Sequence, residues 1–527
     1  MDYDAIVIGA GMGGLSAGAC LAAGGARTLI LEQSNAVGGC AGSFENGGFH
    51  FDVGACIIQV PRAHDRLFET LGLRREDYVT FLQNDPTYEF VDVLGGRRFT
   101  TPSSLEGTAE VIARFDPDDA RNFLLLMRRY GPRFDAFNDV MMTTPQGRLR
   151  DMAKVFARCP SGLLALPDVL KPYSKVLDDY FKHPVTRGLL STYSAIGGLP
   201  PSLQTAMMLW LCHTEHDGTY YPAGGMGALP RGVAKAFGDL GGDLRLETPV
   251  RRVLVEKGRA RGVELADGTA ITSRVLVANN NARNLYLEMV GRDRIPRAVV
   301  KGLESYEWSP SCCVAYLGLD YRPELRAQHM VGLIDPGLTD LYLKDVYTKG
   351  LALPQSVGLV SSPSYMDPSL APEGQASLAL IAMAPPHPAG TTWSDIKWDF
   401  LDGMITTADA MFLPGLKDHV VFKTIATPED FERRLSMPNG SIYAFSFSIL
   451  SQMVFRPANR SRCIDGLYLC GASTHPGGSV PGSVFSGMMV SEMALEEMDS
   501  RAGSRSGRPR PSSETGVMDG LTDRRCA

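Results

Sequence analysis

A glycine-rich loop between an apolar run and an alanine-rich segment constrains the fold of this chain more than any other feature. Residues 5–8 read AIVI, which has the length and β-branching of a buried parallel strand, and GAGMGG follows at 9–14. The proline-free segment 15–23 is predicted to be helical, so its N-terminal amides can face a pyrophosphate. The three glycines of the motif would give the tight turn, the close phosphate approach and the close helix packing: Gly9, Gly11 and Gly14.

A second strand supports the interpretation as a dinucleotide site, which the 56 glycines alone would not, since they produce such spacings by chance. Residues 28–31 read TLIL and end in Glu32, 23 positions after Gly9, close to the roughly 20 expected for an acid that binds an adenosine ribose. Glu32 would also repel a 2′-phosphate. The alternative is a plain βαβ turn with Glu32 as a solvated strand end, and the spacing favours the nucleotide.

The continuation of the chain distinguishes FAD from NAD. After Glu32 come Gly38 and Gly39, and then SFENGGFHFDVGA at 43–55, with a hairpin-like turn and Gly54 following Asp52. Here the sequence resembles the large flavoprotein class that includes amine oxidases and phytoene desaturases. In that class a GG pair after the acid and an fDxG segment line the FAD, so the resemblance implies FAD as the cofactor.

Two later blocks extend this pattern. Residues 222–290 predict a helix from about Leu229, strands around Val250, Val263 and Val275, and a β-meander with turns at Lys257–Gly258 and Asp267–Gly268. In GLYLCGASTHPGGSVPGSVF at 466–485, a strand at 467–470 leads through Gly471 and a proline-glycine loop to a helix near Ser483.

With these blocks the chain resembles the bacterial-type phytoene desaturase, carotenoid isomerase and retinol saturase family. The resemblance implies that the last helix faces the flavin pyrimidine edge, where its positive end stabilises reduced flavin. It also implies further cofactor contacts, namely Val250 through its backbone, Gly471, Ser473, Pro481 and Val484. The chain departs from the pattern in having Cys40 where desaturases often carry arginine, and Ala472, Ser473 and Thr474 where many flavoproteins place an acid.

The expected fold is α/β, with a Rossmann-like FAD-binding domain of the amine oxidase and phytoene desaturase type, a mixed-sheet substrate domain and a helical lid. We expect the FAD domain to be discontinuous, and apolar faces at helical spacing predict the lid. The predicted divisions are 1–75, 222–290 and 456–500 for FAD, 76–115 and 291–455 for the substrate sheet, 116–221 for a lid or membrane-facing subdomain, and 501–527 for a disordered tail.

Composition and charge limit the class of protein, its partners and its cellular location. Hydrophobic residues at 44%, charged residues at 21% and a net charge of −6 are typical of a folded soluble protein and argue against a nucleic-acid partner. Ten cysteines without a CxxC indicate free thiols, and no signal peptide is expected, so we predict a cytoplasmic protein. The uncharged runs 188–214 and 435–455 contain glycine and proline and do not predict membrane spans.

Membrane contact is predicted from another segment. Residues 148–175 place basic side chains beside apolar ones, as in a peripheral anchor on the inner face of the cell membrane. An amphipathic lid helix without membrane contact is the alternative. A lipid-borne substrate would favour the anchor.

Few side chains are needed for flavin hydride chemistry, so catalytic residues stay unassigned. His475 is a weak candidate, because a histidine tied into a turn is the favoured explanation of this residue. His213 and His216 lack a second ligand cluster, so no metal is expected, and the Cys312–Cys313 pair fits a core better than a redox site. Runs such as MMLW at 207–210 and YAFSFSILSQMVF at 443–455 predict either a tunnel for a polyene or ordinary packing.

The predicted function is an FAD-dependent oxidoreductase that acts on carbon–carbon bonds of a long isoprenoid or polyene, with hydride transfer at flavin N5. Because no second glycine fingerprint follows, an external electron acceptor or donor is expected. The first alternative is a reduced-flavin isomerase or a retinol-type saturase. Cys40 favours this alternative over a desaturase, because desaturases often carry arginine at this position. An amine oxidase and a non-catalytic FAD-binding protein are further alternatives.

Overall fold

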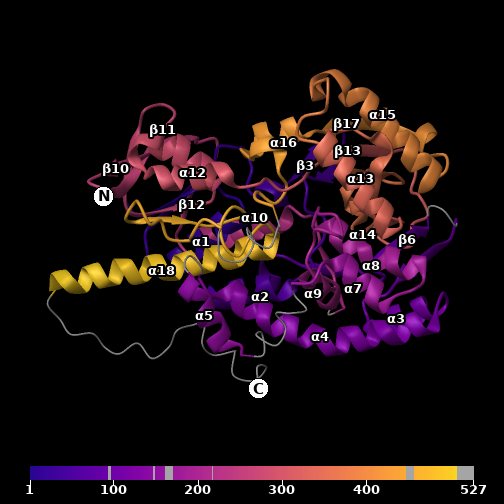
Figure 1. The fold of residues 1–527 in the computed structure, drawn as a ribbon. Coiled ribbons are helices and arrows are strands. Elements are labelled where there is room, and N and C mark those ends of the chain that lie inside the picture. Colours follow the sequence, from indigo (N-terminus) through magenta and orange to yellow (C-terminus); the bar gives the residue numbers. More distant parts are fainter. Residues whose placement is uncertain (93–95, 146–148, 161–169, 217, 447–455, 507–527) are drawn as a thin grey trace.

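Two seven-stranded sheets organise the computed structural model of the chain, and Figure 1 shows how they are arranged. The structure describes residues 1–92, 96–145, 149–160, 170–216, 218–446 and 456–506. The first sheet lies on the left of the view and the second on the right, and a layer of helices lies beneath the second sheet.

The first sheet has the order β10-β11-β12-β1-β2-β9, with β18 added beside β12. β1 runs parallel to β2 and β12, β2 runs parallel to β9, and β12 runs parallel to β18, so these five strands end at the same edge. This is why β1 reads as a continuous apolar run, since a parallel strand is covered on both faces. The bounds are β1 (Tyr3–Ile8), β2 (Thr28–Leu31), β9 (Asp243–Arg245), β10 (Val250–Glu256), β11 (Arg259–Leu265), β12 (Ala270–Ala278) and β18 (Leu467–Leu469). The predicted meander is confirmed, because β10, β11 and β12 pair antiparallel.

One face of this sheet is covered by α1 (Met12–Ala23), α10 (Ala228–Asp239) and α18 (Val480–Ser506). α1 is rich in glycine and alanine, which lets α18 approach it closely. A Cβ on Gly487 of α18 would lie 2.3 Å from the carbonyl oxygen of Gly13, so the contact requires glycine. The close packing joins the C-terminal block of the chain to the N-terminal glycine loop.

The second sheet has the order β17-β13-β16-β15-β14-β6-β7 and is antiparallel except for the β14–β6 pair. One face packs on α15 (Trp393–Met411), whose Trp393 and Met404 are fully buried. The strands are β6 (Tyr88–Asp92), β7 (Arg98–Thr101), β13 (Ser311–Leu319), β14 (His329–Leu333), β15 (Val357–Ser361), β16 (Ala376–Ala384) and β17 (Val420–Ala426).

The helical layer shares a hydrophobic core with β6, β7 and β14. The buried carboxylate of Asp119 accepts hydrogen bonds from the backbone N–H groups of Lys182 and His183, each at 2.9 Å, which ties the long helix α4 to the turn before α8. The helices are α3 (Leu105–Ala113), α4 (Pro117–Thr143), α5 (Leu149–Arg158), α7 (Tyr173–Tyr180), α8 (Pro184–Ile196) and α9 (Leu209–Glu215).

Smaller elements connect these parts. Two antiparallel two-stranded sheets pair β3 (Ser43–Asn46) with β4 (Phe49–Asp52), and β5 (Phe81–Gln83) with β8 (Tyr220–Pro222). Within the described residues the remaining α-helices are α2 (Pro61–Thr70), α11 (Ala282–Asn284), α12 (Arg297–Ser305), α13 (Pro336–Lys349), α14 (Pro363–Met366) and α16 (Pro428–Leu435). The division into domains, including a lid role for 116–221, stays a prediction.

One boundary was predicted wrongly. The tail was expected to be disordered from 501, but α18 continues to Ser506. Arg501 pairs with Glu497 one turn earlier, at 3.2 Å, and the first proline beyond this point is Pro509. Residues 507–527 lie outside the described part of the chain. Among the described helices, none combines the length and hydropathy that a membrane crossing requires.

Candidate active site

The glycine loop folds as its spacing predicts. Gly9 ends β1 with φ of +93°, and Gly11 precedes the first residue of α1. A Cβ on Gly14 would lie 2.0 Å from the carbonyl oxygen of Gly9, so this glycine allows the helix to pack against the strand. Gly11 and Gly9 line a large cavity, whereas Gly14 lies behind them. The N-terminus of α1 therefore presents its amides to the cavity.

Glu32 lies at the edge of this loop and lines the same cavity. Its Oε2 accepts a hydrogen bond from the backbone N–H of Ala10 at 2.7 Å, and its Oε1 accepts one from Ser34 at 2.9 Å. The carboxylate is thus held beside the phosphate loop, where an adenosine ribose would lie.

The GG pair and the fDxG segment form the next part of the wall. Gly38 donates its N–H to the carbonyl of Ala10 at 2.8 Å, and Gly38, Gly39 and Gly54 line the cavity. Asp52 is buried and accepts hydrogen bonds from the Tyr221 hydroxyl at 2.6 Å and the Met226 N–H at 2.9 Å. Burial raises the pKa of Asp52 to about 6. Asp52 therefore holds this segment to β8 rather than facing the cofactor space.

The C-terminal block adds Gly471, Ser473 and Pro481 to the cavity wall. The hydroxyl oxygen of Ser473 accepts a hydrogen bond from the N–H of Ala282 at 2.9 Å. The expected contact from Val484 is not found, because its side chain is fully buried in the core between α18 and α1. One turn into α18, this residue points toward the neighbouring helix.

All these segments border one cavity of about 1260 Å³, which exceeds the roughly 300–1,000 Å³ of typical ligand sites. It therefore has room for a dinucleotide and a second molecule. The sequence-predicted residues on its wall are Gly9, Gly11, Glu32, Gly38, Gly39, Gly54, Val250, Gly471, Ser473, Pro481 and His475. The glycine loop, the helix N-terminus and the positioned acid match the pyrophosphate and ribose of FAD.

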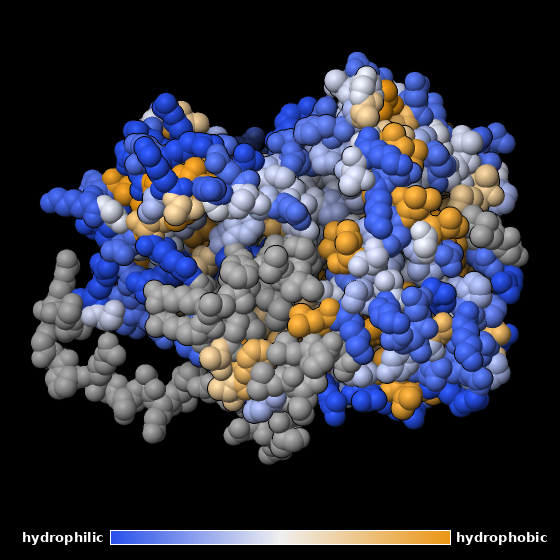
Figure 2. Space-filling model, viewed as in Figure 1, coloured by the Kyte–Doolittle hydropathy of each residue, from blue (hydrophilic) through white to orange (hydrophobic). Residues whose placement is uncertain are grey.

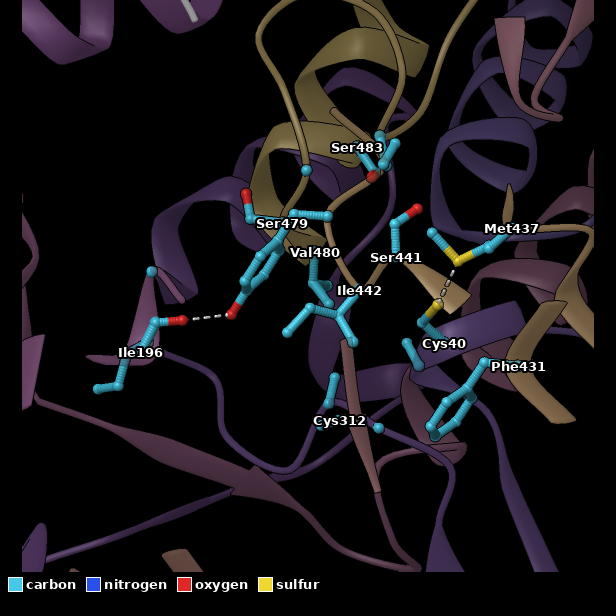
Figure 3. Close-up of a pocket in the computed structure, with 18 of the residues that line it drawn as sticks. Cys40, Ile196, Cys312, Phe431, Met437, Ser441, Ile442, Ser479, Val480 and Ser483 are labelled. Atoms are coloured by element: carbon cyan, nitrogen blue, oxygen red, sulfur yellow. Dashed lines mark hydrogen bonds between the residues drawn. The ribbon is translucent and has the colours of Figure 1, made fainter. Parts of the chain in front are cut away.

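Away from the glycine loop the wall is mostly apolar. Met207, Met208 and Trp210 of the MMLW run line it, as do Tyr443 and Ala444. Residues 447–455 of the second predicted run lie outside the described residues. Figure 3 shows Cys40, Cys312, Phe431 and Ile442 around one part of this wall, where Cys40 Sγ lies 3.5 Å from Met437 Sδ.

Comparison with known proteins identifies the family. Residues 12–495 match the family described as flavin containing amine oxidoreductase. The chain belongs to this family. It is accordingly an FAD-dependent oxidoreductase.

Relatives of this flavin-containing oxidoreductase include carotenoid enzymes. A lycopene-forming phytoene desaturase of Pseudescherichia vulneris is 31% identical over 94% of this chain and 99% of its own length. A chloroplastic prolycopene isomerase of Daucus carota is 26% identical over 94% of this chain and 80% of its own length. A solved putrescine oxidase with bound putrescine shares the fold, with a TM-score of 0.63 and 14% identity over 95% of this chain and 99% of its own.

His475 of the flavoprotein is tied into its turn. The ring is buried, which lowers its pKa to about 4, so the imidazole is neutral near pH 7. Its Nε2 lies 2.7 Å from the carbonyl oxygen of Met141 on α4 and donates to it. Although His475 borders the cavity, this bond supports the structural interpretation.

Asn279 is a wall residue that the sequence analysis missed. It follows β12, donates its backbone N–H to the carbonyl oxygen of Ile8 at 2.9 Å, and lies against Gly11 and Gly471. A Cβ on Gly471 would lie 2.5 Å from its Oδ1. The available signal was its position at the carboxyl end of a parallel strand, where ligand sites gather.

The cysteine and histidine side chains that the sequence singled out do not come together in one site. Cys313 is buried in the core under α15, while the neighbouring Cys312 faces the cavity, so the two thiols point to opposite sides of β13. His213 packs against Gly131, and His216 Nε2 lies 3.2 Å from Thr108 Oγ1. Within the described ranges no three potential metal ligands come together.

Proposed function

We propose that this flavoprotein is a carotenoid desaturase, which introduces carbon–carbon double bonds into a long apolar isoprenoid. The observation that carries the proposal is the single cavity, which joins the glycine loop to a wall of methionine, leucine and aromatic side chains. The similarity to phytoene desaturases over nearly the whole chain supports the same substrate class.

The chain's own residues would bind and orient the reactants. The glycine loop and Glu32 hold the dinucleotide, and the apolar wall orients the polyene and excludes water. When bound, FAD would supply the two-electron oxidant that takes up the two hydrogens removed from adjacent substrate carbons. His475 contributes by holding the turn beside this site.

A carotenoid isomerase is the second candidate. The similarity to prolycopene isomerase favours it, and Cys40 at the cavity wall agrees with it. Amine oxidation has weaker support, because the similarity to putrescine oxidase concerns the fold alone.

The partners in this proposal are an apolar polyene, an external electron acceptor and a membrane surface. Leu338 and Leu341 on α13 border the cavity and are 48% and 57% exposed, and Figure 2 shows apolar surface over this helix. A bilayer against α13 would let a lipid-borne substrate enter the cavity. We place the protein in the cytoplasm, peripheral on the inner face of the cell membrane. Sedimentation with anionic liposomes tests this, and Leu338→Ser with Leu341→Ser should reduce it.

The experiment for the proposed function is product analysis. Purified holoenzyme is incubated with phytoene in detergent and a quinone acceptor, and the products are separated and weighed by mass spectrometry. A desaturase yields products lighter by pairs of hydrogens. Products of unchanged mass from a cis-polyene would mark an isomerase, and heavier products from a reduced flavin would mark a saturase.

A further inference from the structure

A buried polar cluster interrupts the apolar wall of the cavity. It consists of Gln59, Tyr88 on β6, Glu215 at the end of α9, and His329 at the start of β14, and we refer to it as the His329 cluster. Gln59, Tyr88 and His329 line the cavity, and Glu215 lies behind them. Apolar neighbours on the same wall include Val331, Leu211 and Leu359.

The fold brings these residues together from distant parts of the chain. β6 and β14 are parallel neighbours in which Tyr88 lies opposite His329, so the two side chains share one side of the sheet. Their ring centroids are 6.0 Å apart. The Tyr88 hydroxyl donates to Oε1 of Glu215 at 2.8 Å, and the Gln59 side-chain amide donates to the same oxygen.

Three polar atoms of the cluster are left without a hydrogen bond. Within the described part of the chain, Nδ1 and Nε2 of His329 and Oε2 of Glu215 have no partner. His329 is 1% exposed and Glu215 is 2% exposed, so bulk water does not satisfy them. Buried polar groups are almost always hydrogen-bonded, so an imidazole with two unpaired nitrogens beside a ligand cavity indicates a missing polar partner.

The chemistry of the imidazole indicates which partner fits. Burial lowers the pKa of His329 to about 3, so the ring is neutral and offers one N–H donor and one acceptor nitrogen. A hydroxyl group can donate to one nitrogen or accept from the other. Asn280 and Asn281 also carry unpaired amide atoms, but they follow Asn279 beside the glycine loop and are available to the dinucleotide.

We propose that the His329 cluster is a subsite for a hydroxyl group, so that the preferred substrate is a hydroxylated polyene and not a pure hydrocarbon. This inference rests on the proposed function, because it assumes that a polyene occupies the cavity. A site built to hydrogen-bond a hydroxyl discriminates strongly against the analogue that lacks it.

The test compares two probes that differ only at one end: phytoene and 1-hydroxy-1,2-dihydrophytoene. Each is titrated without oxygen into reduced holoenzyme, whose flavin cannot accept a hydride, and Kd is read from the quenching of tryptophan fluorescence. The kcat/KM is measured separately with oxidised holoenzyme and a quinone acceptor. We expect the wild-type protein to bind the hydroxylated probe at least about tenfold more tightly. Equal affinities would overturn the proposal and leave an ordered water as the partner of His329.

Variants test whether His329 causes the preference for the hydroxylated probe. His329→Phe should bring the ratio of the two Kd values close to one, and His329→Gln should keep most of the preference for the hydroxylated probe, since glutamine retains a donor and an acceptor. Thr192→Val is the matched control, because the Thr192 hydroxyl lines the same cavity but already donates to the carbonyl of Gly188 at 3.4 Å. A preference that survives in a folded His329→Phe protein would contradict the assignment.

The two proposals fail in different ways. If neither probe binds or is dehydrogenated, the proposed function is wrong. If both are dehydrogenated with equal kcat/KM, the desaturase stands and the hydroxyl subsite is wrong. The wild-type comparison decides this even if a His329 variant does not fold.

Discussion

The carboxylate of Glu32 accepts a hydrogen bond from the backbone N–H of Ala10, with 2.7 Å between Oε2 and the nitrogen. The acid that follows β2 is therefore bonded to the phosphate loop that follows β1. Its second oxygen accepts the N–H of Ser34. Glu32 thus orders the loop in addition to facing the ribose position.

Replacing this acid should weaken cofactor binding. Glu32→Ala should cost about 1–3 kcal/mol of FAD affinity, because a charge-assisted acceptor is lost from both the loop and the ribose position. The dissociation constant can be measured by flavin fluorescence. Glu45→Ala, on the exposed strand β3, is the control and should bind FAD normally. Unchanged affinity in Glu32→Ala would place the ribose-binding acid elsewhere.

A side chain on the phosphate loop should exclude the cofactor. A Cβ on Gly11 would lie 2.8 Å from Nδ2 of Asn279, so Gly11→Val should yield colourless protein after purification. Gly302→Ala on α12 has no atom within 4 Å of the added Cβ, and it should keep its flavin and gain about 0.5–1 kcal/mol of stability. Stoichiometric flavin in Gly11→Val would refute the placement of the pyrophosphate.

Glu215 should give the protein a distinct pH dependence. Burial raises its pKa from 4.5 to about 7, so the folded state keeps a proton that the unfolded state releases between these values. The free energy of unfolding should therefore fall by about 3 kcal/mol from this group as the pH rises from 4.5 to 7.

Glu215→Gln should lack this component. Urea unfolding of the wild type and of Glu215→Gln at pH 5 and pH 8 gives the change in the free energy of unfolding for each protein, and the difference between the two changes is the contribution of Glu215. The raised pKa of Asp52 affects both proteins alike. Tyr88 and Cys212, which face Glu215, have pKa values raised above their usual range and stay uncharged in this window. A parallel pH dependence in the two proteins would mean that Glu215 is ionised when folded.

A buried ion pair should hold α18 to the first sheet. Glu497 lies 2.9 Å from Arg259 on β11, with both side chains at most 10% exposed, and also accepts the Tyr468 hydroxyl at 2.7 Å. Glu497→Ala should cost about 3–5 kcal/mol, because it leaves the Arg259 charge buried without its partner. The double variant Glu497→Leu with Arg259→Met should recover most of the loss. A cost below about 1 kcal/mol for Glu497→Ala would show that the pair is dispensable.

The features that could be predicted from the sequence are those determined by residues close together in the chain. The strand, glycine loop and helix around Gly11 follow from residue types that are adjacent in the chain, and Glu32 follows from its spacing. The bounds of α15 could be predicted because Trp393 to Met411 has its apolar face at helical spacing, and Thr392 caps it by accepting the N–H of Asp395.

Long-range packing explains what the sequence could not predict. The pairing of Tyr88 with His329 depends on the register of two strands that are far apart in the chain. Asn279 becomes a wall residue only because β12 lies beside β1. Val484 was misplaced because the rotation of α18 against α1 decides which of its side chains face the cavity.

In a carotenoid desaturase the polyene reduces the bound flavin directly. The most direct measurement is to mix oxidised holoenzyme with one equivalent of phytoene without oxygen or added acceptor, and to follow the flavin absorbance together with the polyene spectrum. A carotenoid desaturase predicts bleaching of the flavin and an equal amount of polyene with a longer chromophore. An oxidised flavin that stays yellow, with phytoene bound but unchanged, would contradict the account.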